Sequence, residues 1–163
     1  KKSIIKMMDR LYPKKIIVVS SAPQIRYPDC YGIDMARLED LIAFRAMLEL
    51  LEENNKYHLV QEVYEKCKAQ VHLEDKDVRN FVKDLYSEFS DEAISNKIAE
   101  LISDDTVKAE VVTIFQPVEN LHKACPKNFG DWYFTGNYPT VGGNRVVNRA
   151  FINFYEGNKE RAY

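Results

Sequence analysis

The sequence predicts an α/β protein in which a short piece of parallel sheet is followed by a mostly helical region. One observation behind this is the continuous β-branched run Ile16 to Val19, which directly follows a short helical pattern. A short apolar run without alternation is typical of a strand covered on both faces, as in a parallel sheet. The other observation is a series of segments with apolar residues at helical spacing, which fills most of the remaining chain.

The N-terminal part is expected to contain a helix, that strand and a long second helix. Apolar residues recur on one side over Ser3 to Leu11, and Pro13 ends the pattern because proline disfavours helical geometry in the residue before it. Asp34 is placed to cap a long helix over Ala36 to Asn54. The apolar face of this helix consists of Leu38, Leu41, Ile42, Phe44, Met47, Leu48 and Leu51.

The remaining elements are predicted from the same kinds of pattern. Helical spacing is most regular over Asp75 to Phe89, and a Ser or Asp caps the helix after it. A β-branched run marks a second strand, a proline opens a turn of helix, and a segment rich in Gly, Asn and aromatics predicts an ordered loop with short extended pieces. The expected ranges are helices Tyr57 to Ala69, Asp75 to Phe89, one from Ser90 or Asp91 through Ile102, one at Pro117 and one over Asn144 to Glu156 ended by Gly157, with a strand over Val111 to Phe115 and the loop over Asn128 to Gly143.

Composition excludes several classes of partner. The chain has 163 residues and a net charge of −2, and it contains no dense basic block. Non-specific nucleic-acid binding requires clustered Lys or Arg, so no nucleic-acid partner is expected. No apolar run approaches the roughly 20 residues of a membrane span, so no membrane partner is expected either. Three widely spaced cysteines fit free thiols in a reducing compartment, and we expect a cytoplasmic protein.

The end of the first strand is the strongest candidate for a site. In open α/β sheets, ligands lie beyond the carboxyl ends of the strands. Ser20, Ser21 and Ala22 would line the rim of such a site, and Arg26 could reach a phosphate. The alternative, a turn that simply leaves the strand, is equally compatible with these residues.

Two further patterns are weaker. Gly142 to Arg145 opens a helix and could bind an anion, with Arg149 one turn further along the same face. A plain Gly-Gly turn with an Asn cap explains that pattern better. The three histidines and three cysteines lack the spacing of a four-ligand metal site, so no metal site is expected from them.

Two segments resemble the amidophosphoribosyltransferase family. The stretch from Ser21 to Met35, SAPQIRYPDCYGIDM, closely resembles a signature that follows a buried strand in these enzymes. Glu39 to Ala43 is similar to the opening of the family's next helix, and Phe134 to Thr140, FTGNYPT, to a later family segment. Residues 50 to 115 match no family segment and look like a helical insertion.

The resemblance implies a role in the first step of purine biosynthesis. In this family a glutaminase domain releases ammonia, and a type I phosphoribosyltransferase domain with a Rossmann-like parallel sheet transfers it to phosphoribosyl pyrophosphate to give phosphoribosylamine. Mg²⁺ would accompany that substrate in the full enzyme. The full enzyme would also be expected to form a homo-oligomer.

The resemblance also implies that parts of the enzyme lie outside this sequence. The family's acidic, Ser/Thr/Gly-rich phosphate loop should precede Lys1, because Ile16 to Val19 runs into Ser-Ser-Ala-Pro instead of paired acids. Since the sequence begins with Lys, we expect a cut or processed end, and a fragment that is not catalytic by itself. Some relatives hold an iron–sulfur cluster in these segments, but Cys30 and Cys125 are out of register, so none is predicted.

The predicted organisation has two parts. Residues 1–35 would be the end of the phosphoribosyltransferase α/β core, and residues 36–163 a helical C-terminal extension that carries the insertion of about 50–115. Two functions stay open at this point. The chain is either part of the enzyme, with the upstream glutaminase and phosphate loop as its partners, or a non-catalytic regulatory or oligomerisation module of a family member that has lost activity.

Overall fold

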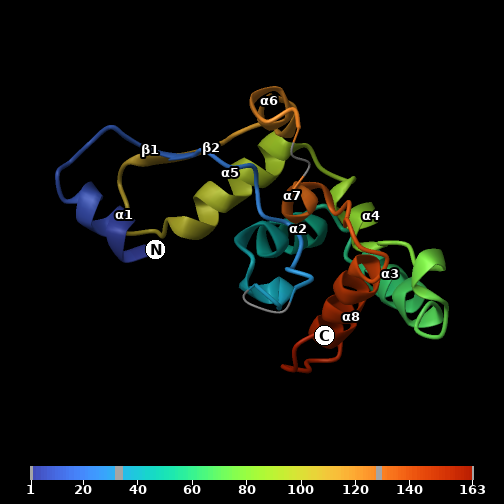
Figure 1. The fold of residues 1–163 in the computed structure, drawn as a ribbon. Helices are drawn as coiled ribbons and strands as arrows, with labels where there is room; N and C mark the ends of the chain where they lie inside the picture. The colour runs from blue at the N-terminus through green and yellow to red at the C-terminus, as the bar shows by residue number, and fades with distance from the viewer. Residues whose placement is uncertain (1, 32–34, 128–129, 163) are drawn as a thin grey trace.

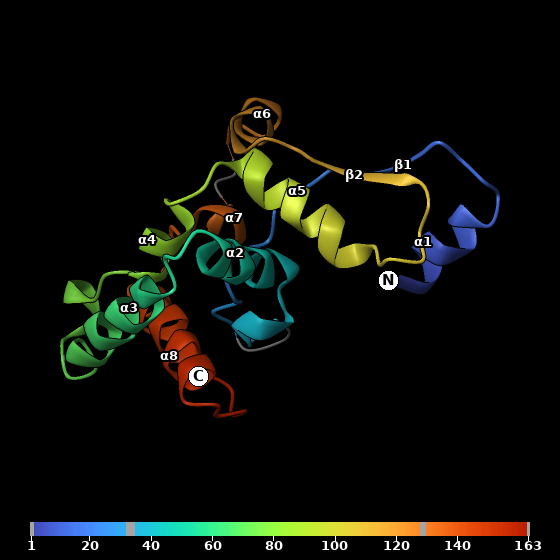
Figure 2. The same ribbon diagram turned by 180° about the vertical axis from the view of Figure 1, so that it is seen from behind.

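The computed structural model describes residues 2–31, 35–127 and 130–162, which form a helical body with a small two-stranded sheet at one end (Figures 1 and 2). The elements in chain order are α1 (Lys2–Asp9), β1 (Lys15–Ser20), the 3-10 turn η1 (Leu38–Asp40), α2 (Ile42–Glu53), α3 (His58–Ala69), η2 (Asp75–Asp77), α4 (Val82–Tyr86), α5 (Asp91–Ile102), β2 (Glu110–Phe115), α6 (Val118–Ala124), α7 (Trp132–Thr135) and α8 (Gly143–Tyr155).

The two strands pair in parallel. Lys15 lies opposite Glu110 at one end of the ladder, and Ser20 lies opposite Phe115 at the other. Between the strands the chain passes through the helical body and returns along α5, whose Ser95 carbonyl accepts a hydrogen bond of 2.7 Å from Thr113 Oγ1 of β2. The prediction of an α/β chain with parallel strands is confirmed at this level.

The exposure of β1 contradicts one expectation. Ile16 is buried beside Ile5 of α1 and Ala109, in a small cluster separate from the main core. Ile17 and Val19, however, are 53% and 70% exposed. The prediction of a strand covered on both faces is therefore wrong for this chain, because α1 covers only the Ile16 side and no described element covers the other.

The main core lies between α2, α3, α5 and α8. Phe44 of α2 is fully buried and makes edge-to-face contacts with Phe151 and Phe154 of α8, at centroid distances of 6.1 Å and 4.9 Å. Most of the apolar face predicted for the long helix is buried here: Leu38, Leu41, Phe44, Met47 and Leu51. Helical periodicity identified these core residues correctly.

The start of that helix was predicted too early. The residues from Leu38 to Asp40 form a 3-10 turn, and Leu41 is extended, with φ −83° and ψ 120°. Helix α2 therefore begins at Ile42. Leu38 and Leu41 are nevertheless buried in the core, although they precede α2. Their apolar spacing therefore looked like one more turn of the helix. The cap predicted at Asp34 lies outside the described residues.

The most regular helical pattern, Asp75 to Phe89, was also misassigned, since only α4 within it is α-helical. Side-chain amides hold the backbone before α4 in an extended form. Gln70 accepts from Arg79 N and donates to Arg79 O, and Asn148 Nδ2 donates to the same carbonyl at 2.8 Å. Those bonds come from distant residues and take the place of helical ones.

The other elements follow the predictions closely. Helix α3 and strand β2 are within a residue of their expected ranges, α8 starts one residue early, and Gly157 follows it with φ 68°. Ser90 caps α5 by accepting a hydrogen bond from Ala93 N at 3.1 Å. The predicted loop includes the short helix α7, where extended pieces were expected. Among the described helices, none combines the length and the apolar character needed to cross a membrane.

Candidate functional site

The candidate site lies where the two parallel strands end. Ser20 and Phe115 form the last pair of the ladder, and the chain then turns away at Ser21 to Pro23 and at Gln116 to Pro117. The first turn of α5 faces these two turns. Both strand ends therefore border one small region, as expected for a parallel pair.

The predicted rim residues differ in how accessible their side chains are to a ligand. Ser20 Oγ donates to Ala22 O at 2.9 Å and lies 3.2 Å from Ala22 N, so its hydroxyl closes the local turn. Ala22 is half-buried, and Ser21 is exposed. Of the three, Ser21 presents the side chain most accessible to a ligand.

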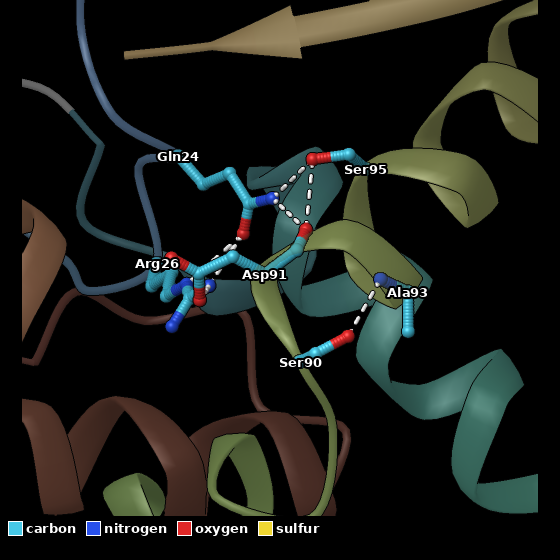
Figure 3. Close-up of polar contacts among 6 residues, drawn as sticks. All are labelled: Gln24, Arg26, Ser90, Asp91, Ala93 and Ser95. Carbon is cyan, nitrogen blue, oxygen red and sulfur yellow. Dashed lines mark hydrogen bonds and ion pairs between the residues drawn. The ribbon is translucent and has the colours of Figure 1, made fainter. Parts of the chain in front are cut away.

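Gln24, which the sequence did not single out, organises the site (Figure 3). Its side chain is buried, and its Nε2 donates to Asp91 O and Ser95 Oγ, both at 2.8 Å. Its Oε1 accepts from Arg26 Nε at 3.1 Å and Nη2 at 2.7 Å. Gln24 thus ties the loop after β1 to the first turn of α5.

Arg26 is engaged by neighbours inside the chain. Its Nη2 forms an ion pair with Asp91 Oδ1, and its guanidinium lies 5.2 Å from the ring centroid of Tyr86. Tyr86 OH donates to the Arg26 carbonyl at 3.0 Å. Burial raises the pKa of Tyr86 well above its ordinary value, so the phenol stays protonated and remains a donor. The contacts hold Arg26 in place and leave its side chain 15% exposed.

The cavity at this point is small, about 90 Å³, and Gln24, Arg26, Asp91, Ser95, Phe115 and Phe134 contribute to its lining. Ligand pockets for small organic molecules are typically about 300–1,000 Å³. The N-terminus of α5 carries Ser90 as its cap and Asp91 and Glu92 in its first turn, and these acids oppose anion binding by the helix dipole. In this chain alone, the site can hold only a group of a few atoms.

A second region joins the loop after β1 to the segment around α7. Tyr133 O accepts hydrogen bonds from the backbone N–H groups of Arg26 (2.8 Å) and Tyr27 (3.1 Å), and Tyr133 OH donates to the buried Asp29 at 2.9 Å. Tyr138 OH donates to Pro28 O at 2.8 Å. The two segments that carried the resemblance, 21–35 and 134–140, are therefore in contact through their described residues. In the sequence, the one feature that points to this contact is that the first segment contains prolines and the second contains aromatic residues, which commonly pack together.

The cysteines lie apart from one another. Cys30 is half-buried, Cys67 is buried and Cys125 is exposed, and all three are free thiols. Burial raises the pKa of the Cys67 thiol to about 12, so it stays protonated. Within the described residues, no group of three or more His, Cys, Asp or Glu side chains could hold a metal ion. The absence of an iron–sulfur cluster stays a prediction.

Two other sequence hypotheses are placed by the structure. His122, expected to be an ordinary residue, has its Nε2 2.8 Å from Oδ2 of the buried Asp131, a contact that joins α6 to the turn before α7. At the start of α8, Asn144 donates to Val78 O at 2.9 Å and does not act as the cap. The Asp75 carboxylate approaches Gly142 there, which opposes an anion at this helix N-terminus.

Comparison with known proteins gives two short matches. The chain is 42% identical over 50 residues to the amidophosphoribosyltransferase of Haemophilus influenzae, which covers 31% of this chain and 10% of that protein. It is 49% identical over 41 residues to the amidophosphoribosyltransferase of Pasteurella multocida, covering 25% of this chain and 8% of that protein. The matches thus span about a tenth of the relatives' length. No protein-family model matches the chain, and no solved structure gives a significant match.

Proposed function

We propose that this chain is part of an amidophosphoribosyltransferase and supplies the strand-end rim of its phosphoribosyl site. The observation that carries the proposal is the contact between residues 134–140 and the segment 21–35, made by the hydrogen bond from Tyr138 OH to Pro28 O and strengthened next to it by Tyr133, which binds Asp29. Both segments resemble the family, and they converge beside the carboxyl end of β1. The short matches to two proteins that bear this name support the same assignment.

The exposed face of β1 supports a larger sheet of the phosphoribosyltransferase type. Parallel sheets are normally covered on both faces. Ile17 and Val19 would be covered by further polypeptide of the parent enzyme, which would include the glutaminase domain and the phosphate loop. In this proposal, residues 1–35 are the end of the α/β core, and residues 36–163 are its helical extension with the insertion of about 50–115.

The rim residues have different roles in this proposal. Ser21 offers an exposed hydroxyl to the sugar phosphate, while Ser20 and Ala22 set the shape of the turn. Arg26 contributes positive charge from a fixed position. The described residues do not fit a protein-held metal ion, and Mg²⁺ would enter the parent enzyme with phosphoribosyl pyrophosphate. The cavity of about 90 Å³ is too small for that substrate, so we expect the chain alone to be inactive.

Three experiments test this function. Calorimetric titration of the 163-residue chain with phosphoribosyl pyrophosphate and Mg²⁺ should give no saturable binding, and micromolar binding would mean that the phosphate cradle lies within this chain. The parent coding sequence upstream of Lys1 should encode paired acids in a Ser/Thr/Gly-rich loop and a processed N-terminal cysteine. In that complete polypeptide, Ser21→Ala should lower kcat/KM for phosphoribosylamine formation, whereas Ser87→Ala, at an exposed serine after α4, should not.

The engagement of Arg26 favours a second candidate function. An arginine whose guanidinium already binds Gln24 and Asp91 and lies over Tyr86 acts as a structural link. This would suit a regulatory or oligomerisation module in which α1 and the open face of β1 bind another subunit. A parent sequence without the acidic loop and the N-terminal cysteine would support the module and exclude the enzyme.

A further inference from the structure

Outside the candidate site, a cavity of about 440 Å³ lies between α3, α8 and the C-terminal segment. Its lining includes Cys67 and Gln70 from the end of α3, Arg145, Asn148 and Arg149 from α8, and Arg161 from the C-terminal segment. None of these residues lines the strand-end cavity. The volume is within the range of about 300–1,000 Å³ that is usual for small-molecule pockets.

The C-terminal segment is fastened in place as one wall of this cavity. Asn153, a buried residue of α8, donates from Nδ2 to Glu160 O at 3.1 Å, and its own carbonyl accepts from Asn158 N at 2.8 Å. Asn158 Oδ1 in turn accepts from Glu160 N at 3.0 Å. These bonds hold the C-terminal segment and Arg161 against α8. Specific hydrogen bonds therefore fix this wall of the cavity.

The cavity carries an excess of positive charge. Arg145 has a structural role, since it binds Asp75 and the carbonyls of Val71 and Leu73. Arg149 and Arg161 line the same cavity, and neither has an ion pair or hydrogen bond among the described residues. Two guanidinium groups that line one space without a hydrogen bond or ion pair to any described residue are suited to a carboxylate or phosphate, because each planar fork can donate two parallel hydrogen bonds.

The acids near these arginines cancel only part of that charge. Glu160 contributes to the lining of the cavity. Glu156 lies near Arg149, but Lys68 Nζ (2.9 Å) and Tyr64 OH (2.7 Å) already bind its Oε1. The hydrogen bond from Lys68, followed by that from Tyr64, lowers the pKa of Glu156, so this carboxylate is ionised and committed to α3.

A buried acceptor in the wall gives a second, independent indication. Asn148 is 3% exposed and lines the cavity, and its Nδ2 donates to Arg79 O at 2.8 Å. Its Oδ1 is buried and has no hydrogen-bond partner among the described residues. A buried acceptor left unpaired is unfavourable, so a donor that reached it would be bound favourably.

We propose that this cavity binds a small organic anion that carries hydroxyl groups, with Arg149 and Arg161 on its anionic group and Asn148 Oδ1 as acceptor for a hydroxyl. Because Asn148 Oδ1 is buried in this structure, binding includes a small outward movement of the cavity wall that exposes this atom to the ligand. The inference rests on the described residues alone and is independent of the proposed enzymatic function. A sugar phosphate and a hydroxycarboxylate share this chemistry.

The test uses the 163-residue chain labelled with ¹⁵N and three probes. Glucose 6-phosphate and citrate distinguish a phosphate from a carboxylate ligand, and glucose offers the hydroxyls without the charge. We expect saturable binding of at least one anion at submillimolar concentration, with none for glucose. The shifted amide signals should come from α8 and residues 158–162 and should include the Asn148 side-chain amide.

Charge variants locate the binding. The double variant Arg149→Gln with Arg161→Gln should weaken binding of the anion at least tenfold. Arg45→Gln removes an exposed helical arginine of α2 that does not line the cavity, and it should change the affinity less than twofold. Absence of binding for both anions, shifts that map to another surface, or a double variant that binds as tightly as the wild type would each overturn the proposal.

Discussion

Gln24 and Asp91 are joined through a hydrogen bond of 2.8 Å from Gln24 Nε2 to the Asp91 carbonyl, between the loop after β1 and the first turn of α5. Arg26 binds both partners, through Gln24 Oε1 and the Asp91 carboxylate. One buried amide therefore positions the loop and the arginine that follows it.

Replacing that amide should destabilise the fold. Gln24→Leu removes one of two side-chain partners from the Asp91 carbonyl, which keeps Ser95 Oγ, and from the Arg26 guanidinium, which keeps the Asp91 carboxylate. We expect a loss of about 1–3 kcal/mol in the free energy of unfolding. Urea denaturation followed by circular dichroism measures it. Gln61→Leu serves as the control, because the Gln61 side chain is exposed and donates to Glu65 on the same helix, and it should stay within about 0.5 kcal/mol of the wild type. Equal losses for the two variants would contradict the role given to Gln24.

Two adjacent glycines should respond differently to alanine. A Cβ at Gly143 would lie 2.2 Å from Tyr138 Cβ, and Tyr138 is held by its bond to Pro28 O. Gly143→Ala should therefore destabilise by about 1–3 kcal/mol through overpacking. A Cβ at Gly142 would meet only Asp75 Oδ2 at 3.5 Å, so Gly142→Ala should be neutral or stabilise by up to about 1 kcal/mol. Thermal denaturation of both variants checks this order, and the reverse order would refute the contact.

The contact between α1 and the segment after α5 should depend on acid pH. Hydrogen bonds from Lys6 and then Thr106 lower the pKa of Asp104 from an ordinary 3.8 to about 2. Because the pKa is lower in the folded chain, the contact stabilises folding above the ordinary pKa, and the gain is lost as pH falls from about 4 to about 2. A ¹³C titration of the carboxyl group should give the low value. Lys6→Gln should raise it toward the ordinary pKa, and Lys15→Gln should leave it unchanged.

The two sides of β1 should tolerate charge unequally. Val19 is 70% exposed, so Val19→Lys should change stability by less than about 0.5 kcal/mol and reduce self-association of the open sheet face. Ile16 is 2% exposed, and Ile16→Lys should cost several kcal/mol because it buries an unpaired charge. Denaturation and sedimentation velocity measure both effects. A large loss of stability in Val19→Lys would mean that this face is covered in solution.

The sequence was sufficient for the elements whose pattern and local chemistry agree. The stripe of α8 and the Ser90 cap of α5 follow from short-range rules, and the β-branched run identified β1 as a strand. Its parallel pairing was predicted correctly, but the burial of both faces on which that prediction was based is not found. Residues 78 to 80 did not follow, because their conformation is set by Gln70 and Asn148, which approach from other helices. Periodicity carries no information about such bonds.

The position of the candidate site could be predicted from the sequence, but the hydrogen bonds and ion pairs within it could not. Ser20 to Ala22 are at the strand end as expected, whereas two partners of Arg26, Tyr86 and Asp91, come from α4 and α5. The sequence therefore indicated a possible phosphate contact without revealing that the guanidinium was already engaged. Arg145 and Arg149 were recognised as one face of α8, but the cavity needed Arg161, which returns from beyond Gly157.

The parallel ladder has a consequence for the order of folding. Lys15 and Glu110 are far apart in the chain, so the two strands can pair only after a long loop has closed. The entropy lost on closing this loop is offset only when the strand contacts form, which slows their pairing. Helices α2 and α5, which contact each other, can assemble earlier and bring β2 to its place. Native-state hydrogen exchange should accordingly release the amides of β1 and β2 well before those of α2.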